Sequence, residues 1–152
     1  MKIKDILAAV PGANLKPGAS GEDIASAERM LAVRFPAELR LLLSISDGFR
    51  EPLGNTQFLY PVSSADGSSW SLVEGTLAVR KDWSQFETGI DLGQYVLFGS
   101  SGWGPYWYCQ CVEPFNIFEH EAGWVSEVKH RSPGILELYR TQFEDLRKIA
   151  SN

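Results

Sequence analysis

The order of the helical and strand patterns predicts an α+β domain, in which N-terminal helices and a C-terminal helix pack on a mostly antiparallel sheet. Residues 20–49 carry the patterns of two successive amphipathic helices. From residue 94 onwards the pattern changes to short segments rich in aromatic and β-branched residues, which are typical of strands. A helical pattern returns after residue 132 and continues toward the C-terminus. Helices and strands are therefore segregated along the chain.

The first helix of the pair has a readable start and an apolar face. Ser20 suits the N-cap position, with Asp23 three residues later. The apolar residues that follow at helical spacing are Ile24, Ala27 and Leu31. We expect this face to be buried.

The second helix is bounded by proline and glycine. Pro36 is predicted at its first position, where the missing N–H would have no helical partner in any case. Its apolar face consists of Leu39, Leu42 and Leu43. Asp47-Gly48 is predicted to end it, because glycine takes the left-handed conformation without a steric penalty.

The rest of the chain is assigned by the same signals. A short helix to about Val10, a strand over 58–62 and a helix over 70–83 that Gly75 breaks or weakens are expected before the strand region. An antiparallel meander is expected from the strands at 95–98, 106–112, 116–119 and 124–129. The terminal helix is predicted to cover one sheet face with Ile135, Leu138, Tyr139, Leu146 and Ile149.

Composition predicts a single domain over residues 1–152, with 44% hydrophobic and 22% charged residues. No apolar run approaches a membrane-spanning length, so no membrane partner is expected. Asp5 interrupts the N-terminal apolar residues, so no signal peptide is predicted and we expect a cytoplasmic protein. The net charge of −5 argues against nucleic acid as a partner and suits a basic protein.

The helical pair resembles the opening of the SUKH superfamily, which includes the yeast Smi/Knr cell-wall regulators and many bacterial toxin-immunity proteins. The motif residues are Ile24, Glu28, Phe35, Pro36, Leu39, Leu42, Leu43, Asp47 and Gly48. Residues 97–104 resemble the family's turn between central strands, and 112–120 resemble the strand that follows. Where family members commonly have aspartates in that turn, this chain has Ser100, Ser101 and Trp103. The resemblance implies an α+β fold and, for many short members, toxin immunity.

The reactive side chains do not form a persuasive catalytic or metal-binding set. Cys109 and Cys111 are expected on one face of a strand as small packed residues, although a metal site completed by His120 and His130 is the alternative. The serines at 100–101 lack the glycine spacing of a nucleophile elbow. We therefore expect no metal, no cofactor and no enzymatic activity. A hydrolase using His120 or Cys109 is the least favoured hypothesis.

A partner-binding surface is predicted around the Gly102-Trp103-Gly104 turn. Trp103 and Tyr106 are expected to act as aromatic anchors, and an acidic rim is expected from Asp82, Glu87 and Asp91. The favoured function is an immunity protein that neutralises a cognate bacterial toxin by direct binding. The alternative is a regulatory adaptor of the Smi/Knr type. The sequence does not indicate an oligomeric state.

Overall fold

The computed structural model describes residues 1–53, 56–63, 70–83, 92–101, 106–120, 129–130 and 134–151. Its helices are α1 (Ile3–Ala9), α2 (Gly21–Leu31), α3 (Ala37–Ile45), α4 (Leu72–Trp83) and α5 (Ile135–Ala150), with a 3-10 turn η1 (Leu92–Gln94). Its strands are β1 (Asn14–Leu15), β2 (Phe49–Arg50), β3 (Gln57–Leu59), β4 (Tyr95–Ser100), β5 (Tyr106–Gln110), β6 (Ile117–His120) and β7 (Lys129–His130). The α+β class is thus confirmed.

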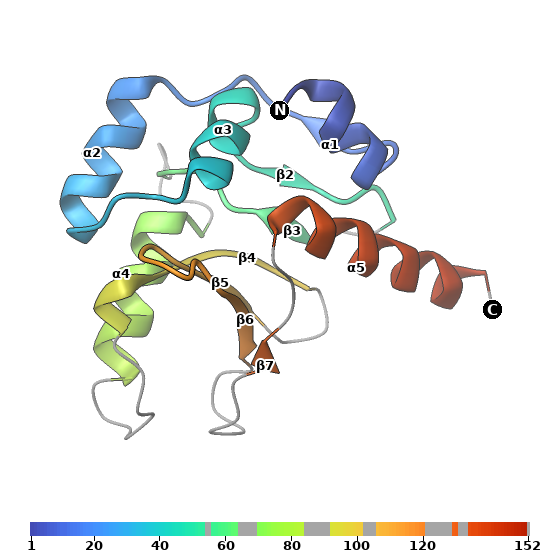
Figure 1. The fold of residues 1–152 in the computed structure, drawn as a ribbon. Coiled ribbons are helices and arrows are strands. Elements are labelled where there is room, and N and C mark those ends of the chain that lie inside the picture. Colours follow the sequence, from blue (N-terminus) through green and yellow to red (C-terminus); the bar gives the residue numbers. More distant parts are fainter. Residues whose placement is uncertain are drawn as a thin grey trace.

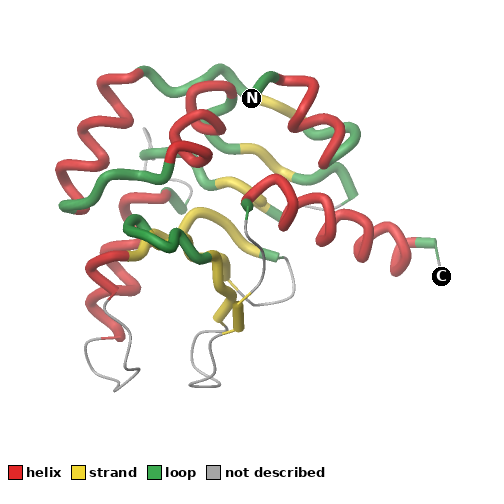
Figure 2. Tube along the Cα trace, in the orientation of Figure 1, coloured by secondary structure: helices red, strands yellow, loops and turns green. Residues whose placement is uncertain are grey.

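The strands form two antiparallel sheets, with the orders β1-β2-β3 and β4-β5-β6-β7. In Figure 1, α1, α2 and α3 lie across the top of the view, α5 lies at the right, and α4 lies beside the start of β4 at the lower left. Figure 2, in the same orientation, shows how short the strands of the β1-β2-β3 sheet are compared with the helices around them. The predicted meander is the second sheet, although residues 124–128 of its last expected strand lie outside the described residues.

The helical pair α2 and α3 forms largely as predicted. The Ser20 hydroxyl accepts a hydrogen bond from the backbone N–H of Asp23 at 3.0 Å, which satisfies a free donor of the first turn. Pro36 is the N-cap of α3 rather than its first residue. Its ψ of 148° is extended, and its carbonyl accepts the first helical bond from the N–H of Arg40. The helix therefore begins one residue later than expected.

Three residues of the SUKH-like motif hold the turns of this pair in place. The Glu28 carboxylate accepts from the N–H of Phe35 at 2.7 Å, bridging α2 to the segment before α3. Asp47 accepts from the N–H of Val62 at 2.8 Å, which ties the end of α3 to the chain after β3. Gly48 has a φ of 84°, and a Cβ there would meet the Pro61 nitrogen at 2.8 Å. These motif positions are therefore structural.

The helix α4 begins at Leu72 and runs through Gly75 without a break, contrary to the expected weakening. The Ser71 hydroxyl accepts from the N–H of Glu74, and the N–H of Gly75 donates to the Ser71 carbonyl. An added Cβ at Gly75 would lie 2.7 Å from Trp70 Nε1 and 3.0 Å from a Leu97 methyl carbon. Side chains packed over the glycine therefore compensate for its low helix propensity.

A bulge in β4 joins the two sheets. Leu97 pairs with Tyr108 and Gly99 pairs with Trp107, so Phe98 is an extra residue on the β4 side. The freed Phe98 carbonyl accepts from the N–H of Tyr60 at 2.8 Å. An added Cβ at Gly99 would lie 1.9 Å from the Phe58 carbonyl oxygen, so only glycine permits this approach of β3 to β4.

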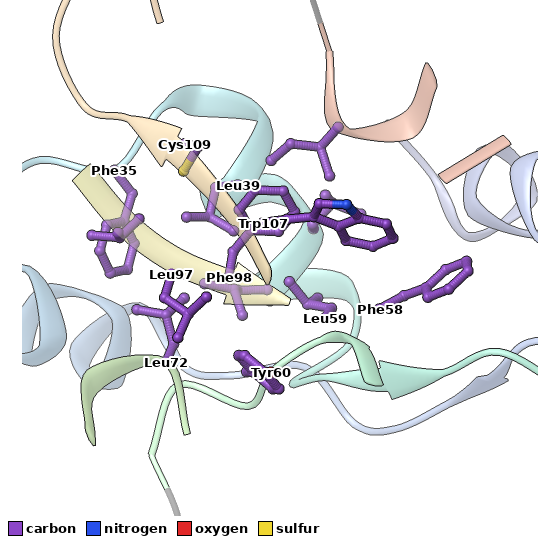
Figure 3. Close-up of a cluster of buried hydrophobic side chains, with 14 of the residues drawn as sticks. Phe35, Leu39, Phe58, Leu59, Tyr60, Leu72, Leu97, Phe98, Trp107 and Cys109 are labelled. Carbon is purple, nitrogen blue, oxygen red and sulfur yellow. The ribbon is translucent and has the colours of Figure 1, made fainter. Parts of the chain in front are cut away.

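The core is an aromatic cluster built around this joint. Phe58 and Tyr139 stack with ring centroids 5.3 Å apart, and Phe58 meets Trp107 edge-on at the same separation. The Tyr139 hydroxyl donates to the Phe58 carbonyl at 2.6 Å, and complete burial raises the pKa of Tyr139 well above its usual value. Figure 3 shows Phe98 and Trp107 side by side, close to Leu39 of α3. Residues from both sheets and from α3 and α5 thus share one core.

Leu42 offers a direct test of the predicted helical face. Its side chain is 0% exposed, whereas the adjacent Leu41 is 46% exposed. We expect Leu42→Ala to lower the free energy of unfolding by about 2 to 5 kcal/mol, because truncation leaves a cavity in the core. Leu41→Ala, which removes the same atoms from the surface, should cost less than about 0.5 kcal/mol. Urea denaturation followed by circular dichroism measures both, and equal losses would contradict the assigned face.

Candidate functional site

A groove of about 410 Å³ opens beside the joint between the two sheets. It is lined by residues from β2, β3, β4 and β5 and from the segments that precede β3 and α4, namely Arg50, Thr56, Gln57, Tyr60, Trp70, Ser100 and Tyr106. The bulge and the close contact at Gly99 fix β3 against β4, so the parts of the groove that these two strands contribute are held in one relative position. The groove is thus a preformed concave surface.

Trp70 contributes a large, exposed aromatic side chain to this groove. Its side chain is 44% exposed, although it comes just before a buried helical turn. The indole lies over Gly75, where the missing Cβ leaves room for Nε1. One part of the ring is therefore fixed against α4, and another part is available for contact with a partner. The sequence gives one signal for this arrangement, a glycine within a helix five residues after a tryptophan.

Hydroxyl groups supply hydrogen bonds on the wall that Tyr60 and Ser100 form. Tyr60 is almost completely buried, and burial raises its pKa to about 12 although its hydrogen bond with Ser100 acts in the other direction. Ser100 in turn donates to the Gln57 carbonyl at 3.4 Å. Tyr60 therefore stays neutral at physiological pH, so the polarity of this wall comes from uncharged groups.

Among the described residues that line the groove, Arg50 is the one that carries a charge. It is exposed and lies on β2, opposite Asn14 of β1 and Gln57 of β3 in the sheet register. A guanidinium offers several N–H donors in a fixed plane, which suits carbonyl or carboxylate acceptors. Together with Trp70, it gives the groove an apolar platform and a cationic donor.

Tyr106 is the predicted site residue that the structure places in this groove. It is half-buried and pairs with Ser100 across β4 and β5 and with His120 across β5 and β6. Trp103, Glu87 and Asp91 lie outside the described residues. The chain leaves the described part at Ser101, whose carbonyl accepts from the Gln142 amide of α5 at 3.3 Å. The groove residues that flank the predicted turn in the sequence are Ser100 and Tyr106.

Asp82 lies elsewhere, so the structure does not bring it together with Tyr106. It is exposed in the last turn of α4, two residues after Arg80. The Arg80 guanidinium donates to the carbonyls of Leu92 and Tyr95, at the start of β4. Tyr106 is opposite the other end of this six-residue strand. Asp82 therefore does not lie beside Tyr106 in the groove, and it does not form an acidic rim there.

The side chains weighed for catalysis are buried in the second sheet. Cys109 and Cys111 are free thiols, and burial, the largest effect, raises the pKa of Cys109 well above its usual value. His120 is the last residue of β6 and is buried there, one residue beyond the expected end of this strand at 119. Among the described residues, no group of three or more His, Cys, Asp or Glu side chains is arranged to hold a metal ion.

None of the helices in the described ranges has the length and apolarity that crossing a bilayer requires. Comparison of the chain with models of protein families and with characterised proteins found no match. The likeness to the SUKH superfamily therefore stays a prediction from the motif residues named above.

The position of Trp70 can be tested through Gly75. Gly75→Ala places a methyl group where the indole nitrogen lies, so the indole must move. We expect a changed chemical shift for the Trp70 indole N–H and a loss of about 1 to 3 kcal/mol in the free energy of unfolding. Gly21→Ala is the matched control, because a Cβ on this helical glycine meets no atom within 4 Å. An unchanged Trp70 indole resonance in the Gly75→Ala protein would show that the ring does not rest on α4.

Proposed function

We propose that the chain is a non-catalytic protein-binding domain whose groove, lined by Trp70, Tyr106 and Arg50, receives a partner protein. The observation that carries this proposal is the exposed indole of Trp70, fixed over Gly75 at the edge of a preformed groove. Trp, Tyr and Arg are the residue types that contribute most to binding hot spots. A rigid anchor also loses little conformational entropy on binding.

The burial of the reactive side chains supports binding rather than catalysis. A catalytic thiol must form a thiolate, and the raised pKa of Cys109 opposes this. His120 is enclosed at the end of β6, paired with Tyr106 across the sheet. A general base has to reach the proton that it removes, and a buried strand residue is poorly placed for this. Both side chains are better explained by packing.

We further propose that the partner is a bacterial toxin and that the chain is its cytoplasmic immunity protein, which covers the active site of the toxin. The SUKH-like motif supports this role, since many short members of that superfamily are immunity proteins. The net charge of −5 supports a basic toxin, because opposite charges accelerate association. Asp82, Glu87 and Asp91 contribute to this long-range attraction, and Trp103 stays a proposed aromatic anchor for the partner.

The test first searches the genes next to the one that encodes this chain for a large reading frame with a secretion module and a variable C-terminal domain. The C-terminal region of such a reading frame is then produced in bacteria, with and without this chain. We expect the chain to restore growth and to bind the region directly. Trp70→Ala should weaken binding by about 2 kcal/mol, chiefly through faster dissociation, as expected for a hot-spot aromatic.

Leu77→Ala is the matched control for this experiment. Leu77 is 43% exposed on α4, the helix that follows Trp70, but is not among the described residues that line the groove. Its substitution should leave binding and growth protection unchanged. If the Trp70→Ala and Tyr106→Ala proteins fold and bind as tightly as the wild type, the groove is not the binding site. If the wild-type chain neither binds nor protects, the immunity function is wrong.

A further inference from the structure

A second surface depression, of about 490 Å³, lies between the end of α2 and the start of α3. Its charged lining consists of Arg29, Arg34, Arg40 and Glu28, and its remaining lining residues are small or apolar. Three guanidinium groups against one carboxylate leave a net charge of +2 at this spot, on a chain whose overall charge is −5. We call these three arginines with Glu28 the arginine depression.

The fold does not require the charges of Arg29 and Arg34. Among the described residues, neither has an acidic oxygen within 4.0 Å, and both side chains are exposed. Arg80 provides the contrast, because its guanidinium donates to four backbone carbonyls, including that of Leu31 at 2.8 Å. Attraction to the C-terminal end of the α2 dipole accounts for Arg29, but Arg34 comes after the helix has ended.

The neighbouring acids are already engaged in structural contacts. Glu28 accepts from the N–H of Phe35, and its Oε2 lies 3.8 Å from Arg40 Nε. Glu38, in the first turn of α3, accepts from the N–H of Leu136 at 2.7 Å and so caps the start of α5. These contacts point both carboxylates at backbone donors. The positive potential of the arginine depression is thus only partly compensated by its own neighbours.

We propose that the arginine depression binds an acidic protein segment, through two or more adjacent carboxylates on the partner. Guanidinium groups match carboxylates in a planar, bidentate geometry, and several of them around one depression favour several carboxylates. The net charge of −5 disfavours a densely charged polyanion such as nucleic acid, whereas a short acidic segment is attracted locally. None of these residues lines the groove at Trp70, so this is a separate surface.

The proposal is tested by nuclear magnetic resonance with a tetra-aspartate peptide blocked at both ends as the probe. The Nε–H resonances of Arg29, Arg34 and Arg40 report contact directly. We expect these resonances to shift saturably with the aspartate peptide and not with a tetra-asparagine peptide. The Arg29→Gln, Arg34→Gln double variant should bind at least about tenfold more weakly, which corresponds to about 1.4 kcal/mol.

The control is the Arg147→Gln, Lys148→Gln double variant, which makes the same change in net charge at exposed positions in the last turn of α5. It should weaken binding by less than about twofold if the contact is local. Equal weakening in both variants would overturn the proposal, because the attraction would then depend only on net charge. Absence of a saturable shift would also overturn it. Tighter binding of inorganic phosphate or of a deoxythymidine oligomer than of the peptide would replace the acidic segment by a small anion or by nucleic acid.

Discussion

The carbonyl group of Phe58 is the point at which β3, β4 and α5 meet. Gly99 of β4 lies so close to it that no side chain fits, and the Tyr139 hydroxyl of α5 donates to it at 2.6 Å. Two residues after Phe58, the N–H of Tyr60 donates to the Phe98 carbonyl, which the bulge in β4 leaves without a partner strand. A buried carbonyl without a donor would destabilise the fold, so these contacts fix the relative position of the two sheets. The groove beside the joint depends on that position.

The sequence predicts the fold best where the determining interactions are local. The α2 and α3 helices have caps, turns and apolar faces encoded within thirty residues, and the cap at Ser20 forms as expected. Gly48 is left-handed, but it does not cap α3, because that helix ends at Ile45 with an extended Ser46 as its C-cap. The strands β1 and β2 have only two residues each, too few for an alternating pattern, and they are defined only by the pairing of β1 with β2 and of β2 with β3. The continuity of α4 through Gly75 was missed because Trp70 and Leu97, which fill the space, act through tertiary packing.

The candidate site was predictable only in part, for a topological reason. Tyr106 is the first residue of β5, and the structure places it in the groove. Asp82 was grouped with it from sequence proximity, but β4 carries the chain away from the end of α4 before β5 begins. Trp70 and Arg50 come to the groove from segments far from Tyr106 in sequence, and no local pattern links them. The motif residues Glu28, Asp47 and Gly48 hold turns, so the family likeness concerns the fold more directly than the binding surface.

Hydrogen exchange at the Tyr60 amide tests the central role of the joint most directly. This N–H bonds to the Phe98 carbonyl, between the two sheets, and can open only if β3 leaves β4. If the joint holds the domain together, the opening free energy of the Tyr60 amide equals the global free energy of unfolding within about 0.5 kcal/mol. The amide of Tyr108, on the strand β5 that pairs with β4, should have the same opening free energy. An opening free energy for Tyr60 less than about half of the global value, with Tyr108 still fully protected, would contradict it. The β1-β2-β3 sheet would then unfold separately from the β4-β5-β6-β7 sheet, and the groove between them would not be rigid.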